Sequence, residues 1–253
     1  MKLAIAGGTG TVGTHVVDAA TAAGHEIAVL SRSARVDLMT GEGLAAVLIG
    51  VDAVIDVSAT RSTATRESVR FFGTATQNLR DAERAADVPH HIALSVIGAA
   101  KVNANYYAGK AVQEQMLLSD TKGGWTLLRA TQFHEFAQQL VHHGKVGPLQ
   151  VVPTMRSQPI AAAEVADELV TIATGGVPRG LEPDLAGPQE ERMADLVKRL
   201  LRAQGKSNAV VQVALPGAWG RGMRDGSLLP DSSTRRGTRT FDDWLKEQTF
   251  PSR

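Results

Sequence analysis

The sequence predicts an α/β protein in which a doubly wound parallel sheet carries helices on both faces and a small lobe follows toward the C-terminus. Two observations indicate this fold. Short apolar runs alternate with helical patterns from residue 2 to residue 130, and the segments between the runs are long enough for helical crossovers. The chain of 253 residues, 43% of them apolar, is large enough for a full core. We expect one domain over 1–253, in which residues from about 131 to 253 contribute the lobe.

The first half follows a strand–helix order. The run KLAIAG at 2–7 is bounded by glycine, as is typical of a strand buried on both faces. The helical pattern at 11–24 places Val12 and Val16 on one side and ends at Gly24. Further helices are expected at 42–50, at 65–87 before Pro89, and at 105–120 with Asn103 or Asn105 as N-cap. The other strands of this half are expected at 26–31, 34–38, 52–59, 91–96 and 125–130.

After about residue 130 the alternation becomes less regular. The segment 216–240 is rich in Gly, Pro, Ser and Arg, which favours a loop over the surface. Arginines alternate with aspartates there, so we expect a solvated loop rather than an anion or nucleic-acid site. The remaining helices are expected at 133–143, 163–174, 189–204 and 240–248, and strands at 149–152 and 209–214.

Composition excludes several classes of function. The 27 Lys and Arg against 26 Asp and Glu leave a net charge of +1, so no overall field attracts nucleic acid or a membrane. The absence of cysteine excludes disulfides, thiolate metal sites and a cysteine nucleophile. His134 and His142 lack an acidic partner at a useful spacing, so no metal site is expected. With neither a secretory pattern nor a membrane-length apolar run, we expect a cytoplasmic protein. It is a monomer or a homodimer, because helices 65–87 and 105–118 can cover the sheet or pair with a second copy.

Four glycines follow the first strand, in AGGTGTVGTH. Gly8, Gly10 and Gly13 fit the pattern G-x-G-x-x-G, and Gly7, Gly10 and Gly13 fit G-x-x-G-x-x-G. Between a strand and a helix, such glycines permit a tight turn and close approach to a pyrophosphate, which the free N–H groups of the helix N-terminus bind. The sequence therefore predicts a dinucleotide-binding Rossmann domain, with an ordinary glycine turn as the alternative.

The turn after the second strand indicates which dinucleotide binds. Sites for NAD place an acid there to hold the ribose hydroxyls. This chain has Ser31, Arg32 and Ser33 instead, and Arg32 can pair with a 2′-phosphate. We therefore expect NADP(H) rather than NAD(H), unless Arg32 is only a solvated loop charge. Arg35 is a second phosphate ligand in this interpretation, and the pair Asp37 and Leu38 flanks the adenine.

Polar residues at the ends of later strands define the expected reaction site. Ligands bind at the carboxyl ends of strands in such sheets. We expect Ser95 to bind a substrate carbonyl, and Tyr106 to protonate it. Lys110 lies four residues after Tyr106 on the same helical face, where it can bind the nicotinamide ribose and lower the pKa of the phenol. Alternatively Tyr106 packs on the sheet, Lys110 is a surface residue and the Ser95 hydroxyl satisfies backbone. The nicotinamide side should also be lined by Ser58, Ala59 and Thr60, and the substrate by Tyr106, Phe133, His134 and Trp219, the last as part of a lid with Met223.

Three motifs, AGGTGTVGTHV, YYAGKAVQE and TLLRATQFHEF, together resemble the NmrA-like, atypical branch of the short-chain dehydrogenase/reductase superfamily over roughly residues 1–200. In this branch the lysine that corresponds to Lys110 occurs more regularly than the tyrosine that corresponds to Tyr106. Some members are redox sensors without turnover, and others reduce quinones, enones or aromatic rings by direct hydride transfer. The resemblance implies NADP(H) contacts at Thr9, Gly10, Thr11, Val12, Arg32, Ser58, Thr60, Ser95, Lys110, Ala130, Thr131, Gln132 and Phe133.

The functional prediction is an NADPH-dependent oxidoreductase that transfers hydride to a quinone, an enone or a polycyclic aromatic ketone. One alternative is a non-catalytic redox sensor that binds NADP(H) and a protein partner. Another is an isomerase or epimerase that uses the cofactor transiently. The partner expected for the leading interpretation is a small-molecule substrate.

Overall fold

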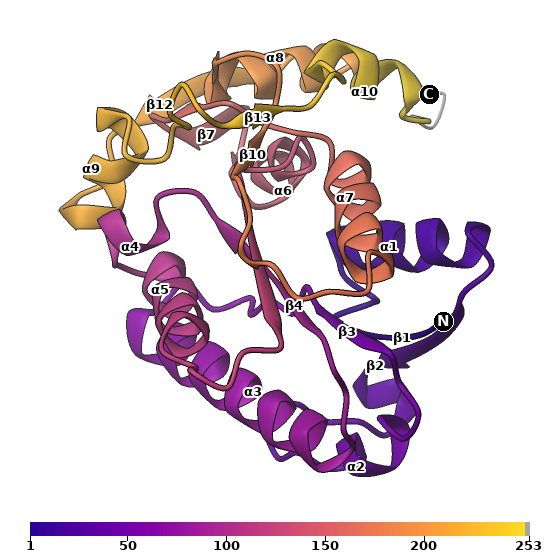
Figure 1. Ribbon diagram of the computed structural model, residues 1–253. Coiled ribbons are helices and arrows are strands. Elements are labelled where there is room, and N and C mark those ends of the chain that lie inside the picture. Colours follow the sequence, from indigo (N-terminus) through magenta and orange to yellow (C-terminus); the bar gives the residue numbers. More distant parts are fainter. Residues whose placement is uncertain (251–253) are drawn as a thin grey trace.

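The computed structural model describes residues 1–250 and confirms the doubly wound parallel sheet (Figure 1). Its strands run in the order β13-β10-β5-β4-β3-β1-β2, and β9 pairs with β5 beside this path; every pairing in the sheet is parallel. The strands are β1 (Lys2–Ala6), β2 (Glu26–Leu30), β3 (Ala53–Asp56), β4 (His91–Val96), β5 (Trp125–Ala130), β9 (Gly180–Leu181), β10 (Leu185–Ala186) and β13 (Arg235–Arg236).

Helices cover both faces of this sheet. Leu3 and Ile5 of β1 belong to the core on the side of α1 (Thr11–Ala22) and α7 (Ala162–Thr174). Ala4 and Ala6 point the other way, into the core with Leu44 of α2 (Leu44–Val47) and Leu79 of α3 (Thr65–Ala85). On that second face α3 lies against α5 (Tyr106–Leu118) (Figure 1). Because both faces are buried, the strands are apolar runs without polar alternation.

The strand expected at 34–38 is wrong. The chain after β2 forms the short 3-10 helix η1 (Arg32–Ala34), and Arg35 adopts a left-handed conformation with φ of 58°. The Asp37 carboxylate then accepts hydrogen bonds from the backbone N–H groups of Met39 and Thr40 at 2.7 and 3.4 Å. These local bonds curl the segment into turns, so β2 is the edge of the sheet.

The lobe is built on a second sheet, in the order β12-β7-β6. Its apolar cluster includes Val152, Leu196, Leu200, Phe241 and Trp244. A two-stranded pair, β8 with β11, lies beside it. The elements are α6 (Phe136–His143), β6 (Lys145–Val146), β7 (Leu149–Pro153), β8 (Arg156–Ser157), β11 (Glu191–Arg192), α8 (Met193–Ala203), β12 (Ala209–Val213), α9 (Gly217–Asp225) and α10 (Phe241–Glu247).

Two helices were not expected from the sequence. The first is α4 (Ala99–Val102), which begins after Gly98, whose backbone adopts a left-handed conformation. The second is α9, which lies within the segment predicted as a loop. A Cβ on Gly222 would lie 2.5 Å from a Val102 methyl group. The glycine content that favoured a loop prediction therefore allows α9 to pack closely on α4. Within residues 1–250, none of the helices combines the length and apolar character that a membrane span requires.

Candidate functional site

The glycine turn lies at the carboxyl edge of the sheet and is too tight for a side chain at Gly7 or Gly13. A Cβ on Gly13 would lie 2.0 Å from the carbonyl oxygen of Gly7, and one on Gly7 would lie 2.7 Å from the Cα of Ser58. Gly7 also has a φ of 84°, which favours glycine. The turn therefore brings β1, α1 and the end of β3 into backbone contact, and it leaves Thr9, Gly10 and Thr11 exposed.

The start of α1 fits the phosphate groups of a dinucleotide. The first N–H groups of a helix have no partner within the helix. At α1 no side chain of the described residues caps them, and the first turn carries no acid that would repel an anion. Val12 and Gly13 are buried behind this surface. Beside Gly7, the Ser58 side chain is buried, and its hydroxyl has no hydrogen-bond partner among residues 1–250. A buried hydroxyl without a partner at this position can form a hydrogen bond with a cofactor atom.

The turn after β2 also fits an extra phosphate. Arg32 and Ser33 are exposed, and Arg32 forms no ion pair with any described residue. The Ser31 and Ser33 hydroxyls lie 2.9 Å apart. One oxygen of Asp37 is committed to the turn described above, and Leu38 packs against the core beside β2, so this pair shapes the loop.

Lys110 is buried rather than a surface residue. Its ammonium group donates to the Leu94 carbonyl at 2.8 Å and to the Gln113 side-chain oxygen at 2.9 Å, and it lies 4.3 Å from the centre of the Phe72 ring. Gln113 in turn donates to the buried carboxylate of Asp56 at 2.8 Å. Burial lowers the pKa of Lys110 to about 8, although the carboxylates of Asp56 and Glu114 raise it.

Ser95 is held by a carboxylate. Its hydroxyl donates to Glu114 at 2.6 Å, and both side chains are buried. The second oxygen of Glu114 accepts from Arg129 at 2.7 Å. The hydroxyl therefore does not satisfy backbone, which was the alternative interpretation, and its lone pairs stay available to a donor.

Tyr106 lies at the start of α5 and packs edge-on against Phe72, with ring centres 5.4 Å apart. Its hydroxyl forms no hydrogen bond with the described residues. The expected lowering of its pKa by Lys110 is wrong in this structure. Burial raises the pKa of Tyr106, and the neighbouring Tyr107 and Asp56 raise it further. The phenol therefore stays protonated, as a proton donor requires.

The segment after β3 reaches the start of α5. Asn105, the N-cap of α5, does not cap the helix with its side chain. Its backbone N–H instead donates to the Thr65 hydroxyl at 2.9 Å, and its side chain donates to the Thr63 carbonyl at 2.9 Å. Ala59 is exposed on this segment and Thr60 is half-buried. The contacts bring the segment after β3 next to Tyr106.

The last residue of β5 and the three residues after it are buried or half-buried. Phe133 packs on the core that includes Val12 and Val57, beside the glycine turn. Ala130 and Thr131 are buried, and the Thr131 hydroxyl donates to the Gln158 carbonyl at 2.6 Å. Gln132 is buried too and links two elements, because it donates to the Tyr107 hydroxyl at 3.2 Å and accepts from Ser157 at 3.1 Å.

Two of the expected substrate contacts lie in the lobe core. His134 is buried, bonds the Arg239 carbonyl at 3.0 Å and packs against the rings of Phe241 and Trp244. The prediction that it lines the substrate pocket is wrong, because α10 covers it. Trp219 belongs to α9 and packs against the same lobe core, so it is not part of a loop-like lid.

Sequence reasoning missed Asp56, Gln113 and Glu114. All three are buried and polar. A signal was present for two of them: Gln113 and Glu114 lie three and four residues after Lys110, on its helical face. Asp56 ends an apolar strand, and its carboxylate accepts from the backbone N–H of Ser58 at 2.9 Å as well as from Gln113. Residues 1–250 contain no group of three or more His, Cys, Asp or Glu side chains that could hold a metal ion.

The fold resembles several solved structures. Escherichia coli NADPH-dependent quinone oxidoreductase, complexed with NADPH, is 19% identical with a TM-score of 0.71 over 96% of this chain and 98% of that one. UDP-N-acetylglucosamine 4-epimerase from Bacillus cereus is 20% identical with a TM-score of 0.70 over 98% and 94%. A short-chain dehydrogenase/reductase superfamily protein from Agrobacterium tumefaciens with bound NAD is 17% identical with a TM-score of 0.69 over 98% and 95%. No protein-family model and no curated protein sequence matches the chain. These likenesses establish the Rossmann fold.

Proposed function

We propose that this protein is an NADPH-dependent reductase of the atypical short-chain dehydrogenase/reductase type, acting on a quinone, an enone or a polycyclic aromatic ketone. The observation that carries the proposal is the carboxyl edge of the sheet. It combines a helix start without a side-chain cap, a tight glycine turn, an exposed Arg32 and a buried Lys110.

The residues have distinct roles in this proposal. NADPH, when bound, supplies the hydride. The N–H groups at the start of α1 hold the pyrophosphate, and Arg32 holds the 2′-phosphate with its planar donor fork. Lys110 and Ser58 face the nicotinamide ribose. The protonated Tyr106, or solvent, supplies the proton to the substrate oxygen. Ser95 orients that oxygen by turning its hydroxyl from Glu114 to the substrate.

The test follows NADPH oxidation with a panel of quinones, enones and aromatic ketones, with NADH as the control cofactor. We expect turnover with at least one class and a preference for NADPH. In the variant Arg32→Ala, the dissociation constant for NADPH should rise about tenfold or more, because a hydrogen bond between charged groups contributes about 1.5–3 kcal/mol. The affinity for NADH should not change.

The matched control is Arg202→Ala, which removes an exposed arginine of α8. Calorimetry on both variants separates the outcomes. Equal affinity of wild type and Arg32→Ala for NADPH would contradict the assignment of the 2′-phosphate.

One observation favours a redox sensor as the second candidate. Lys110 and Ser95 are already satisfied by Leu94, Gln113 and Glu114, so neither is free without a local rearrangement. Tight NADPH binding without turnover of any acceptor would support the sensor. Conversion of substrate with no net NADPH consumption would support an isomerase or epimerase.

A further inference from the structure

The lobe contains a cavity that does not include the glycine turn. It has a volume of about 520 Å³, within the range of small-molecule sites. Strands β8, β11 and β12, helix α9 and the residues just before β8 and β11 supply its walls. The residues that line it are Thr154, Met155, Arg156, Glu190, Arg192, Gln212 and Arg224.

The charges around this cavity do not balance. Three guanidinium groups face one carboxylate, which leaves two positive charges. Glu190 accepts from Nε and Nη2 of Arg156 at 2.7 and 3.1 Å, so this pair neutralises itself. Among residues 1–250, neither Arg192 nor Arg224 has a carboxylate partner. The hydrogen bond from Arg156 is the main cause that lowers the pKa of Glu190. Arg192 lies close enough to Glu190 to lower this pKa further.

Two of the arginines are held in place before any ligand binds. Both carboxylate oxygens of Glu190 bind the Nε–Nη2 edge of Arg156, and Arg224 donates to the Leu215 carbonyl at 2.8 Å. An arginine that is already fixed loses less side-chain entropy when an anion binds. The Thr154 hydroxyl and the Gln212 amide add further polar groups.

We propose that this cavity binds the phosphate group of a small molecule. A phosphate monoester carries nearly two negative charges at neutral pH, which matches the two uncompensated guanidinium groups. A single carboxylate would leave one of them unpaired. The planar donor fork of arginine also suits a phosphate, which offers several oxygens to it.

The cavity is joined to the candidate reaction site through β8. Ser157, the neighbour of Arg156, donates to Gln132, and Gln132 donates to the hydroxyl of Tyr107 at the start of α5. A ligand in the cavity would thus lie against the strand that anchors this end of α5. The proposal itself does not depend on the reductase assignment.

The test is calorimetric titration of the full chain with inorganic pyrophosphate, in wild type and in Arg192→Gln. Arg192 is exposed and has no side-chain hydrogen bond to another described residue, so the variant should fold. We expect pyrophosphate to bind wild type and the affinity of this site to fall about tenfold in Arg192→Gln. Arg202→Gln, an exposed arginine of α8, is the matched control and should behave as wild type.

The glycine turn can also bind pyrophosphate, so Gly10→Ala distinguishes the two sites. The cavity site should persist in that variant. The proposal is overturned if wild type does not bind pyrophosphate, if Arg192→Gln binds it as tightly as wild type, or if Gly10→Ala alone removes all binding. Failure of NADPH turnover would leave this result unchanged, which separates the two proposals.

Discussion

At the scale of single residues, the least usual feature is a lysine buried among polar partners. Because burial lowers the pKa of Lys110 from 10.5 to about 8, the unfolded chain binds this proton more strongly than the folded protein does between those values. The free energy of unfolding should therefore rise with pH from about 8 to 10, by at most about 1.4 kcal/mol per pH unit. Above pH 10 the raised pKa values of Tyr106 and Tyr107 reverse the slope, because the unfolded chain then loses protons first.

Urea unfolding at a series of pH values measures this slope. The variant Lys110→Met should lose the rise, since it removes the titrating group. Lys246→Met removes an exposed lysine and should keep the rise. If Lys110→Met shows the same slope as wild type, another group titrates in this window and the burial argument is wrong.

At the scale of elements, the turn between β1 and α1 separates folding from ligand binding. Gly13→Ala would place a Cβ 2.0 Å from the Gly7 carbonyl oxygen, so we expect it to destabilise the protein by about 2–3 kcal/mol. Gly10 has an ordinary φ of −87°, and its added Cβ would lie 3.2 Å from that oxygen, so Gly10→Ala should cost less than about 1 kcal/mol. Its methyl group would nevertheless stand where the phosphates approach, and NADPH affinity should fall roughly tenfold.

The two variants form a matched pair, to be compared by urea unfolding and by NADPH calorimetry. The expected pattern is a stability defect in Gly13→Ala and a binding defect in Gly10→Ala. Equal NADPH binding by Gly10→Ala and wild type would show that the phosphates do not approach this backbone.

Elements also show where sequence reasoning succeeds. Up to residue 130, buried strands and amphipathic helices alternate, and each carries its own periodic signal, so the sheet and the glycine turn could be predicted. The exceptions depend on contacts that the pattern does not contain. The segment 34–38 curls because the Asp37 carboxylate bonds the backbone of the next residues, α9 packs closely on α4 because Gly222 meets Val102, and His134 is buried because α10 folds over it. In the site, Lys110 and Ser95 were identifiable by position, but Asp56, which Gln113 links to Lys110, lies 54 residues before Lys110 and looked like the end of a strand.

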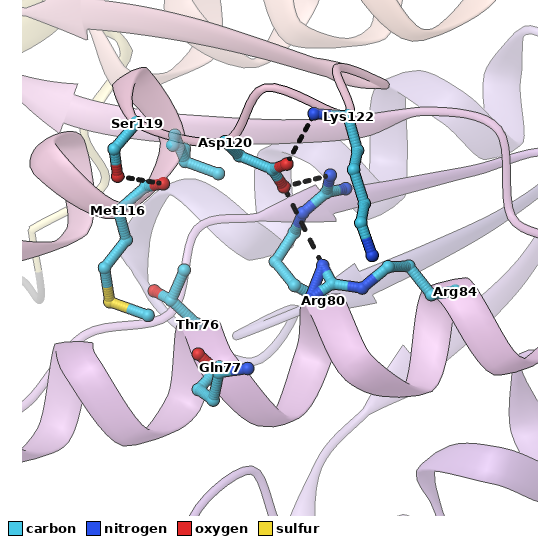
Figure 2. A pocket seen from close by; sticks show the side chains of 9 residues that line it. Thr76, Gln77, Arg80, Arg84, Met116, Ser119, Asp120 and Lys122 are labelled. Atoms are coloured by element: carbon cyan, nitrogen blue, oxygen red, sulfur yellow. Dashed lines mark hydrogen bonds and ion pairs between the residues drawn. The ribbon is translucent and has the colours of Figure 1, made fainter.

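At the scale of the whole molecule, one edge of the sheet carries the candidate site and the opposite edge carries a cluster of ion pairs. The carboxyl edge carries the glycine turn and Lys110. At the opposite edge, Arg80 of α3 lies where β4 and β5 begin, beside a cavity of about 240 Å³ (Figure 2). Arg80 donates to Glu83 at 3.0 Å, to Asp120 at 2.9 Å and to the Gly123 carbonyl at 2.8 Å. Glu83 also bonds His91, the first residue of β4, at 2.7 Å. One guanidinium group thus joins α3 to the segment between α5 and β5.

Arg80 should therefore contribute to the stability of the protein and not to cofactor binding. Arg80→Met would leave the buried Glu83 and the largely buried Asp120 without their main cation, and removing one partner of a buried ion pair costs about 3–5 kcal/mol. Arg84→Met is the matched control, because Arg84 is 37% exposed and lies 3.7 Å from the same Asp120 oxygen (Figure 2), so it should cost less than about 1 kcal/mol. Urea unfolding measures both costs, and calorimetry at a temperature where Arg80→Met remains folded should give an unchanged NADPH affinity. A loss of NADPH affinity in folded Arg80→Met would instead show that the two edges of the sheet are coupled.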